Sequence, residues 1–176
     1  MEIKTTRLAL REFVAADWRA VLAYQSDARY LRFNEWEARS ESDVRAFIQR
    51  FIDWQAEQPR RKFQLAIDCA GRLIGNCGVR IADPAMRQAE LGYELDPNYW
   101  GNGYATEAAH AMLDFGFREL QLERVTAWCL AENVSSVRVL HKIGMKCEAV
   151  THEQKWFKGR WWDALTFGIS AQAYNG

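Results

Sequence analysis

The sequence has few residues of the kinds that build metal centres or disulfide frameworks. Its four cysteines, Cys69, Cys77, Cys129 and Cys147, lie far apart, and no C-x-x-C pair occurs. The three histidines do not cluster with them, so we expect no metal site. The cysteines lie mostly in apolar, strand-like segments, and buried free thiols in a reducing cytosol account best for them.

Net charge and long apolar runs are also absent. The 176 residues carry 23 Lys and Arg against 23 Asp and Glu, which argues against a nucleic-acid footprint spread over the surface. No apolar run reaches the roughly 18 residues of a membrane span, and the N-terminal MEIKTTRLALREF lacks a signal-peptide apolar core. We therefore expect a cytoplasmic globular protein without nucleic-acid or membrane partners, folded as one domain over residues 1–176.

Hydrophobic periodicity predicts a mixed α/β layout in this chain. The predicted strands are residues 5–13, 63–69, 73–81, 87–95, 124–130, 146–157 and 161–170, and the predicted helices lie near 17–24, 44–54, 105–120 and 135–143. Ser40-x-x-Asp43 resembles a capping box before the second helix, and Gly144 is expected to end the fourth.

The connections between these elements indicate how the strands pair. Short turns at residues 70–72 and 158–160 predict antiparallel hairpins. The strand–helix–strand unit over residues 87–130 should instead pair its two strands in parallel. The expected fold class is therefore α/β of the α+β kind, with a mostly antiparallel sheet flanked by helices.

The segment LGYELDPNYWGNGYATEA, residues 91–108, joins a strand to a helix through a glycine-containing loop. Pro97 and Asn98 end the strand, because proline cannot donate to the ladder. Gly101 and Gly103 then precede a helix that begins near Ala105. The first helical amides lack intrahelical partners, and glycine lets an anion approach them, so we interpret the loop as an anion-binding turn. The alternative is a connection that uses glycine only for its geometry.

Two nucleotide-binding interpretations fit this loop poorly. A P-loop needs glycine-lysine-Ser/Thr, and no lysine lies near Gly103. A dinucleotide fingerprint needs a third glycine or alanine where Thr106 stands, and an acidic residue about 20 positions on. In that region Arg124 begins another strand instead.

The loop resembles the acetyl-CoA pyrophosphate loop of the GNAT superfamily of N-acetyltransferases. The superfamily usually has Gln or Arg at the position of Trp100, and Trp-Gly-x-Gly-Tyr-Ala is the form of the RimJ/RimL-type branch. The resemblance covers nearly the whole chain, through TTRLALREF, LIGNCGV, AELGYELDPNYWGNGYATEA, LERVTAWCLAENVSSVRVLHKIGM and FKGRWWD.

The resemblance implies a GNAT-like twisted sheet with a splayed central strand pair that holds acetyl-CoA as co-substrate. It implies an enzyme that moves an acetyl group to a primary amine by direct transfer in a ternary complex. The amine could be a protein N-terminal α-amine or a small amine, and dimers are common in this branch. The alternative is a catalytically silent module that binds acyl-CoA as a sensor.

The resemblance also assigns residues to the cofactor. The cofactor-binding residues it implies are Leu95, Trp100, Gly101, Asn102, Gly103, Tyr104, Ala105, Thr106 and Asn133. Among them Leu95 would stabilise the oxyanion through main-chain amides near the strand end. Asn133 would bind the pantetheine arm or a water.

Three residues are candidates for the chemistry. The acceptor amine is mainly protonated at pH 7, so a base accelerates the transfer. Glu90 is the first candidate and Glu94, on the same strand face, the second. The alternative for both is a structural ion pair with an arginine such as Arg80 or Arg124.

The group that protonates the leaving thiolate has two candidates, a side chain and solvent. Ser136 would lie near the thioester sulfur, although Asn133 or Ser136 could equally be an ordinary helix N-cap. Many superfamily members place a tyrosine four residues beyond the Ser136 position, where this chain has Leu140. We therefore expect Ser136 or solvent to protonate the thiolate.

Overall fold

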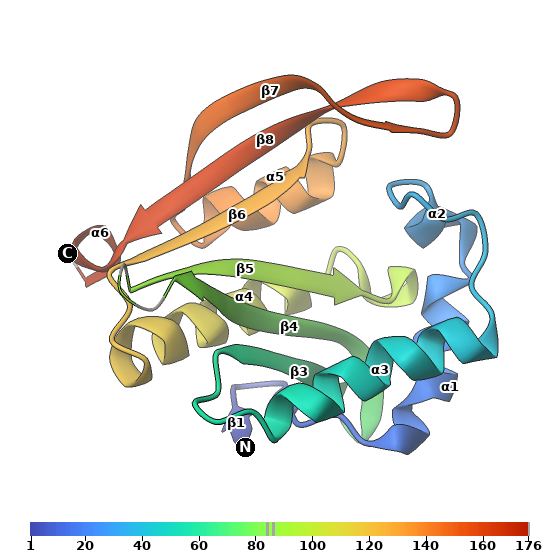
Figure 1. Ribbon diagram of the computed structural model, residues 1–176, viewed down its shortest axis with the longest axis horizontal. Helices are drawn as coiled ribbons and strands as arrows, with labels where there is room; N and C mark the ends of the chain where they lie inside the picture. The colour runs from blue at the N-terminus through green and yellow to red at the C-terminus, as the bar shows by residue number, and fades with distance from the viewer. Residues whose placement is uncertain (84, 86, 176) are drawn as a thin grey trace.

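The computed structural model describes residues 1–83, 85 and 87–175. In this part of the chain a single sheet of eight strands runs in the order β1-β2-β3-β4-β5-β6-β8-β7 (Figure 1). The strands are β1 (Glu2–Lys4), β2 (Ala9–Arg11), β3 (Lys62–Cys69), β4 (Arg72–Asp83), β5 (Gln88–Leu95), β6 (Arg124–Leu130), β7 (Lys146–Phe157) and β8 (Arg160–Ser170). The α-helices are α1 (Trp18–Gln25), α2 (Ala28–Leu31), α3 (Glu41–Gln55), α4 (Tyr104–Asp114), α5 (Val134–Lys142) and α6 (Ala171–Asn175). Two short 3₁₀ helices, η1 (Ala15–Asp17) and η2 (Pro97–Tyr99), and a π-helix, η3 (Phe115–Glu119), complete the set.

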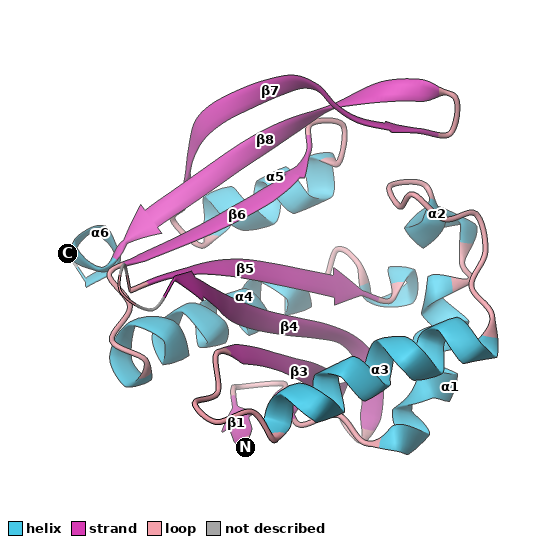
Figure 2. Cartoon of the chain, viewed as in Figure 1, coloured by secondary structure: helices cyan, strands magenta, loops and turns pink. Residues whose placement is uncertain are grey.

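Helices cover both faces of the sheet (Figure 2). On one face α1 packs on β4 and α3 packs on β3, whereas α4 packs on β4 and β5 from the other face. Because side chains alternate along a strand, Leu65 and Ile67 of β3 join the core under α4, and Ala66 joins the core under α1 and α3. The two cores are therefore separated by the sheet itself.

The central strands β5 and β6 form the parallel pair that the sequence predicts, and they then separate. Gln88, Ala89 and Glu90 pair with Arg124, Val125 and Thr126. Beyond Glu90 no further pairing of β5 with β6 occurs among the described residues, although β5 stays paired with β4 up to Leu95. Figure 1 shows the two strands diverging towards the C-terminal end of β5. The splayed pair expected from the resemblance is present.

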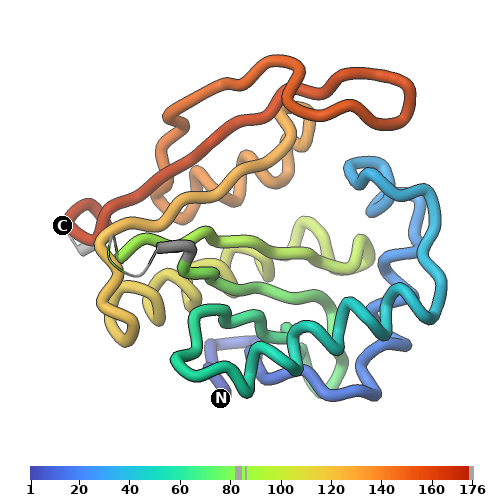
Figure 3. The backbone as a smooth tube through the Cα atoms, in the orientation of Figure 1, coloured from blue at the N-terminus to red at the C-terminus, as the bar shows by residue number. Residues whose placement is uncertain are grey.

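The open end of the splay is flanked by the segment around α2 and by the β7–β8 hairpin. Figure 3 shows these two parts of the trace approaching one another. Phe33 packs on Trp162, with ring centroids 6.2 Å apart, and Lys158 donates to the Leu31 carbonyl. These contacts join two segments that are more than one hundred residues apart in sequence.

Most local predictions are confirmed. Ser40 caps α3 in a full capping box with Asp43, and Gly144 follows α5 with φ +83°. The two-residue turn between β3 and β4 has φ +52° at Ala70 and +79° at Gly71, as a tight hairpin requires.

Two predictions are corrected by the structure, and two short helices are added. The strand predicted over residues 5–13 is a turn followed by β2, because the Thr5 hydroxyl accepts from the Leu8 amide at 3.0 Å and satisfies it locally. The short helices α2 and α6 were not predicted, since four or five residues are too few to show a period. Cys77 and Cys129 are buried as expected, whereas Cys147 is exposed.

No helix among the described residues is long and apolar enough to cross a membrane. The same residues contain no group of three His, Cys, Asp or Glu side chains placed to hold a metal ion.

Candidate active site

Two cavities meet where β5 and β6 separate. One has a volume of about 440 Å³ and lies between the glycine-containing loop, the start of α4 and α5. The other, of about 470 Å³, lies between α3, β4, β5 and β6. Tyr93, Glu94 and Ser136 line both. We call the first the loop cavity, the second the α3 cavity, and these three residues the junction.

The loop cavity is bounded by the glycine-containing loop and the exposed amides at the start of α4. Gly101 and Gly103 both have φ +79°, a left-handed conformation that favours glycine. Gly103 is the N-cap of α4, and Tyr104, Ala105 and Thr106 follow it in the cavity wall. The first amides of a helix have no intrahelical acceptor and lie at the positive end of its dipole, so this wall attracts an anion.

Arg7 holds this loop in place. Its Nε donates to Glu107 at 2.6 Å, its Nη1 donates to the Asn102 carbonyl at 2.9 Å, and its guanidinium lies 4.5 Å from the centroid of the Tyr104 ring. Burial acts to raise the pKa of Glu107, but hydrogen bonds from Thr5 and Arg7 outweigh it and lower the pKa. Sequence reasoning missed this clamp, because Arg7 is about one hundred residues from its partners.

Two cations of α5 face the loop cavity. Arg138 and Lys142 are one helical turn apart and both line it. Neither has an ion-pair partner within residues 1–83, 85 and 87–175, and both side chains are exposed. Their i, i+4 spacing is the sequence signal that could have found them.

The Leu95 backbone faces the splay. Successive amides of a strand point to opposite sides, and the Asp96 amide donates to Ile74 of β4 at 2.7 Å. The Leu95 amide therefore points away from β4, towards the side that β6 has left. The Leu95 carbonyl on that side accepts from the indole of Trp100 at 2.9 Å, which fixes the strand end to the loop.

Glu94 lies in a polar network at the junction. Its Oε2 accepts from Tyr24 at 3.1 Å, Gln25 at 3.0 Å and Asn76 at 3.1 Å. Burial raises the pKa of Tyr24 well above its ordinary value, so this phenol stays a donor to the carboxylate. Buried donors from α1 and β4 thus orient a half-buried carboxylate towards both cavities.

Ser136 is the other polar group of the junction. Its backbone amide donates to Asn133 Oδ1 at 3.2 Å, so Asn133 is the N-cap of α5. The Ser136 hydroxyl lies 2.8 Å from Tyr93 Oη. Burial raises the pKa of the neighbouring Cys129 thiol to about 11, which keeps that sulfur protonated at neutral pH.

Glu90 is placed differently from Glu94. It lines the α3 cavity and a further cavity over β6 and β8, but not the loop cavity. Arg80 donates to it at 3.0 Å and also to Gln64 at 2.9 Å. The ion pair with Arg80 that the sequence left open as an alternative is therefore present.

The α3 cavity has aromatic walls and balanced charge. Its aromatic residues besides Tyr93 are Phe47, Phe51, Trp54 and Trp128. Its positively charged residues are Arg50 and Arg80, and its negatively charged residues are Glu90 and Glu94. The lining therefore carries no net charge when all four are ionised.

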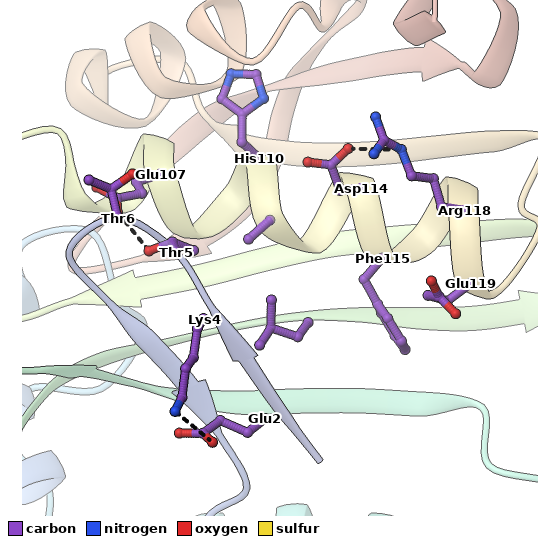
Figure 4. A pocket seen from close by; sticks show the side chains of 12 residues that line it. Glu2, Lys4, Thr5, Thr6, Glu107, His110, Asp114, Phe115, Arg118 and Glu119 are labelled. Carbon is purple, nitrogen blue, oxygen red and sulfur yellow. Dashed lines mark hydrogen bonds and ion pairs between the residues drawn. The ribbon is translucent and has the colours of Figure 1, made fainter.

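A further cavity, of about 640 Å³, lies elsewhere, between the β1–β2 hairpin and the outer face of α4 (Figure 4). Its walls carry the ion pair of Asp114 with Arg118 and that of Glu2 with Lys4. It shares no residue with the junction, so its size alone does not make it the candidate site.

The structure brings most of the sequence-predicted site residues to one cavity. The loop cavity is lined by Glu94, Leu95, Trp100, Gly101, Gly103, Tyr104, Ala105, Thr106, Asn133 and Ser136. Glu90 lies outside it, as described. Asn102 also lies outside, since its side-chain amide donates back to the carbonyls of Tyr99 and Trp100 at 3.2 and 3.1 Å and so braces the loop.

Comparison with known proteins identifies the family. The acetyltransferase (GNAT) domain model matches residues 7–146. The chain belongs to the GNAT acetyltransferase family. It is 35% identical to the uncharacterized N-acetyltransferase YnaD of Bacillus subtilis, over 99% of this chain and 100% of that one. Family membership and this relative make the protein an acyltransferase.

Solved GNAT structures share the fold. An acetyltransferase of the GNAT family from Bacillus anthracis superposes with a TM-score of 0.84 at 31% identity, covering 98% of this chain and 99% of that one. The ribosomal L7/L12 α-N-protein acetyltransferase RimL, solved with coenzyme A, gives a TM-score of 0.86 over 98% and 99% of the chains, at 19% identity. An identity this low shows the GNAT fold alone, so the RimJ/RimL-type branch stays a prediction.

Proposed function

We propose that this GNAT chain transfers the acetyl group of acetyl-CoA directly to a primary amine. The observation that carries the proposal is the pair of cavities that open on opposite sides of the splay and meet at Tyr93, Glu94 and Ser136. One cavity suits the coenzyme and the other suits the acceptor, and the acetyl group would pass between them at the junction, whose residues line both.

The loop cavity fits coenzyme A by its donors and its charge. The diphosphate would lie against the amides of Tyr104, Ala105 and Thr106, with Arg138 and Lys142 supplying positive charge. Bound there, acetyl-CoA supplies the activated acetyl group. The Leu95 amide, which points into the splay, would donate to the developing oxyanion.

Glu94 is the base favoured by this geometry. A base must lie within hydrogen-bond reach of the amine, directly or through one water. Glu94 is at the junction, whereas Glu90 is four residues back, ~13 Å along the strand, and is engaged by Arg80. Glu94 would take the proton from the amine, and its network with Tyr24, Gln25 and Asn76 would hold it in place.

Direct transfer is supported by the state of the nearest thiol. An acetyl-cysteine route needs a thiolate, and burial raises the pKa of Cys129 to about 11. Cys129 also lines neither the loop cavity nor the α3 cavity. The thiol is therefore a poor nucleophile, and the amine itself would attack the thioester.

The charge of the α3 cavity favours an acceptor with a single amine. Its two carboxylates are matched by two guanidinium groups, so a polyamine with several positive charges would lack compensating partners. We propose a protein N-terminal α-amine as the acceptor, and a small monoamine as the second candidate. The aromatic walls would contact the acceptor's apolar or cationic parts.

A thiol-release assay tests the function. The intact protein is incubated with acetyl-CoA and one acceptor at a time from a panel of N-terminal peptides, amino acids, spermidine and an aminoglycoside, and free coenzyme A is measured. We expect release with N-terminal peptides or small monoamines and the least release with spermidine. Tight binding of acetyl-CoA without release for any amine would favour the silent acyl-CoA-binding module instead.

A further inference from the structure

Two hydroxyl groups face each other across the junction. Tyr93 lies on the half of β5 that has left β6, and Ser136 lies in the first turn of α5. Tyr93 Oη is 2.8 Å from Ser136 Oγ and 3.1 Å from the Ser136 carbonyl oxygen. Both residues line both cavities, so this pair bridges the splay at the point where the acetyl group would cross.

Tyr93 and Ser136 together carry two hydroxyl protons, and the hydrogen bond between their hydroxyls uses one of them. Burial raises the pKa of Tyr93, so the phenol remains protonated and remains a donor at neutral pH. Tyr93 can give its single proton either to Ser136 Oγ or to the Ser136 carbonyl oxygen. When it donates to Ser136 Oγ, the Ser136 proton is not used within the pair and can turn from the neighbouring Cys129 side chain to a ligand. Without Tyr93 no phenol orients the Ser136 hydroxyl, and its proton can turn to the neighbouring Cys129 side chain.

The helix itself offers no phenol at this place. Leu140, one turn beyond Ser136, is 1% exposed and belongs to the core under α4. The other tyrosines of the loop cavity, Tyr30, Tyr99 and Tyr104, do not line the α3 cavity. Tyr93 is therefore the phenol that both cavities share among the described residues.

We propose that Tyr93 is a positioning residue for the leaving group: it holds the Ser136 hydroxyl so that its proton faces the sulfur. This inference rests on the proposed function. As the carbon–sulfur bond breaks, its electron pair passes to sulfur, and Ser136 Oγ gives sulfur its proton. Tyr93 Oη passes a proton to Ser136 Oγ. The proton that Glu94 took from the amine returns to Tyr93 through water, so the protons balance.

Kinetics of four variants test the pair. Tyr93→Phe should lower kcat 10- to 100-fold while KM for acetyl-CoA changes less than about twofold, because the lost contact acts on the leaving group. Ser136→Ala should cost at least as much. The double variant should be within about threefold of Ser136→Ala, since residues that act as a unit are not additive. Tyr174→Phe is the matched control, because Tyr174 of α6 lines neither cavity and should keep its kcat.

A binding measurement gives a readout that does not depend on turnover. Calorimetry compares free coenzyme A with desulfo-coenzyme A, which lacks the thiol. One hydrogen bond to sulfur should make the intact protein prefer coenzyme A about fivefold. Tyr93→Phe and Ser136→Ala should reduce this preference below about twofold. Tyr93→Met, which also lacks the hydroxyl, replaces Tyr93→Phe if thermal melting shows that the latter has lost its fold.

The outcomes separate this inference from the proposed function. A Tyr93→Phe variant with unchanged kcat, or Tyr93 and Ser136 effects that multiply, would overturn the role of Tyr93 while leaving the acetyltransferase intact. No coenzyme A release by the unmodified protein with any amine would instead reject the proposed function. In that case an unchanged thiol preference in Tyr93→Phe would overturn the pairing as well.

Discussion

Replacing Glu94 with glutamine removes one negative charge from the junction and little else. The carboxylate oxygen Oε2 accepts three hydrogen bonds, from Tyr24, Gln25 and Asn76. The carbonyl oxygen of glutamine can accept the same bonds. The variant therefore tests whether the charge, and the ability to take a proton, is needed for turnover.

Glu94→Gln should cause a large loss of rate and a moderate loss of stability. General base catalysis contributes ~10²–10⁴-fold, or about 3–5 kcal/mol of activation free energy. Hydrogen bonds to a charged acceptor stabilise a protein by ~1.5–3 kcal/mol, against ~0.5–1.5 for neutral partners. Three weakened bonds then lower the unfolding free energy by about 3–4.5 kcal/mol. At ~2–4 °C per kcal/mol for a protein of this size, Tm should fall by about 6–18 °C.

The assay is thiol release at saturating acetyl-CoA, well below the variant's Tm, with the best acceptor of the panel. Glu90→Gln is the matched control, because it removes a carboxylate from the same strand face but outside the junction. At saturating acceptor it should keep its kcat within about threefold, since its partly exposed ion pair with Arg80 contributes little. The reasoning is refuted if Glu90→Gln loses the activity and Glu94→Gln keeps it; Glu90 would then be the base.

Three further predictions concern the loop cavity and the contacts of Arg7 and Glu107 that hold its loop in place. Gly103→Val should raise KM for acetyl-CoA at least tenfold and affect kcat less, because the backbone conformation at φ +79° strains a β-branched residue. An unchanged KM would contradict the anion-binding role of the glycine-containing loop. Arg138→Ala and Lys142→Ala should each weaken coenzyme A binding a few-fold at low salt and less at high salt. The control variant Lys146→Ala on β7 should bind coenzyme A like the unmodified protein. A loss of affinity that does not depend on salt would argue against an electrostatic role of these two cations. Glu107→Gln should have a smaller free energy of unfolding than the unmodified protein above about pH 5, because the pKa of Glu107 is lowered in the folded state and the stabilisation is lost on protonation. Chemical denaturation should show the difference in unfolding free energy narrowing as the pH falls below 4.5, the ordinary pKa of a glutamate. A difference that stays constant down to about pH 3 would contradict this.

Elements with local causes were predictable from the sequence. The capping box of Ser40 and Asp43 begins α3, and the glycines after α5 and inside both hairpins take the left-handed conformations that their turns need. These features depend on neighbours within four residues. The parallel pairing of β5 with β6 was also predictable, because a strand–helix–strand connection allows few alternatives.

The extent of each strand was less predictable where partners come from far along the chain. The residues around Thr5 alternate like a strand, yet they form a turn that is held to α4 through Arg7 and Glu107. Those contacts join segments about one hundred residues apart. The turn closes locally through Thr5 and Leu8, but its attachment to α4 depends on partners that no local pattern records, so periodicity alone extended the strand too far.

The candidate site divides in the same way. The sequence by itself determined the anion-binding loop, the family resemblance and the set of possible carboxylates, because each depends on residue type and spacing over a short segment. Only the tertiary structure decided that Glu94 rather than Glu90 faces both cavities, and that Tyr93 meets Ser136. The physical reason is that pairing of β5 with β6 ends after Glu90, and the separation of two strands is fixed by the helices packed on them.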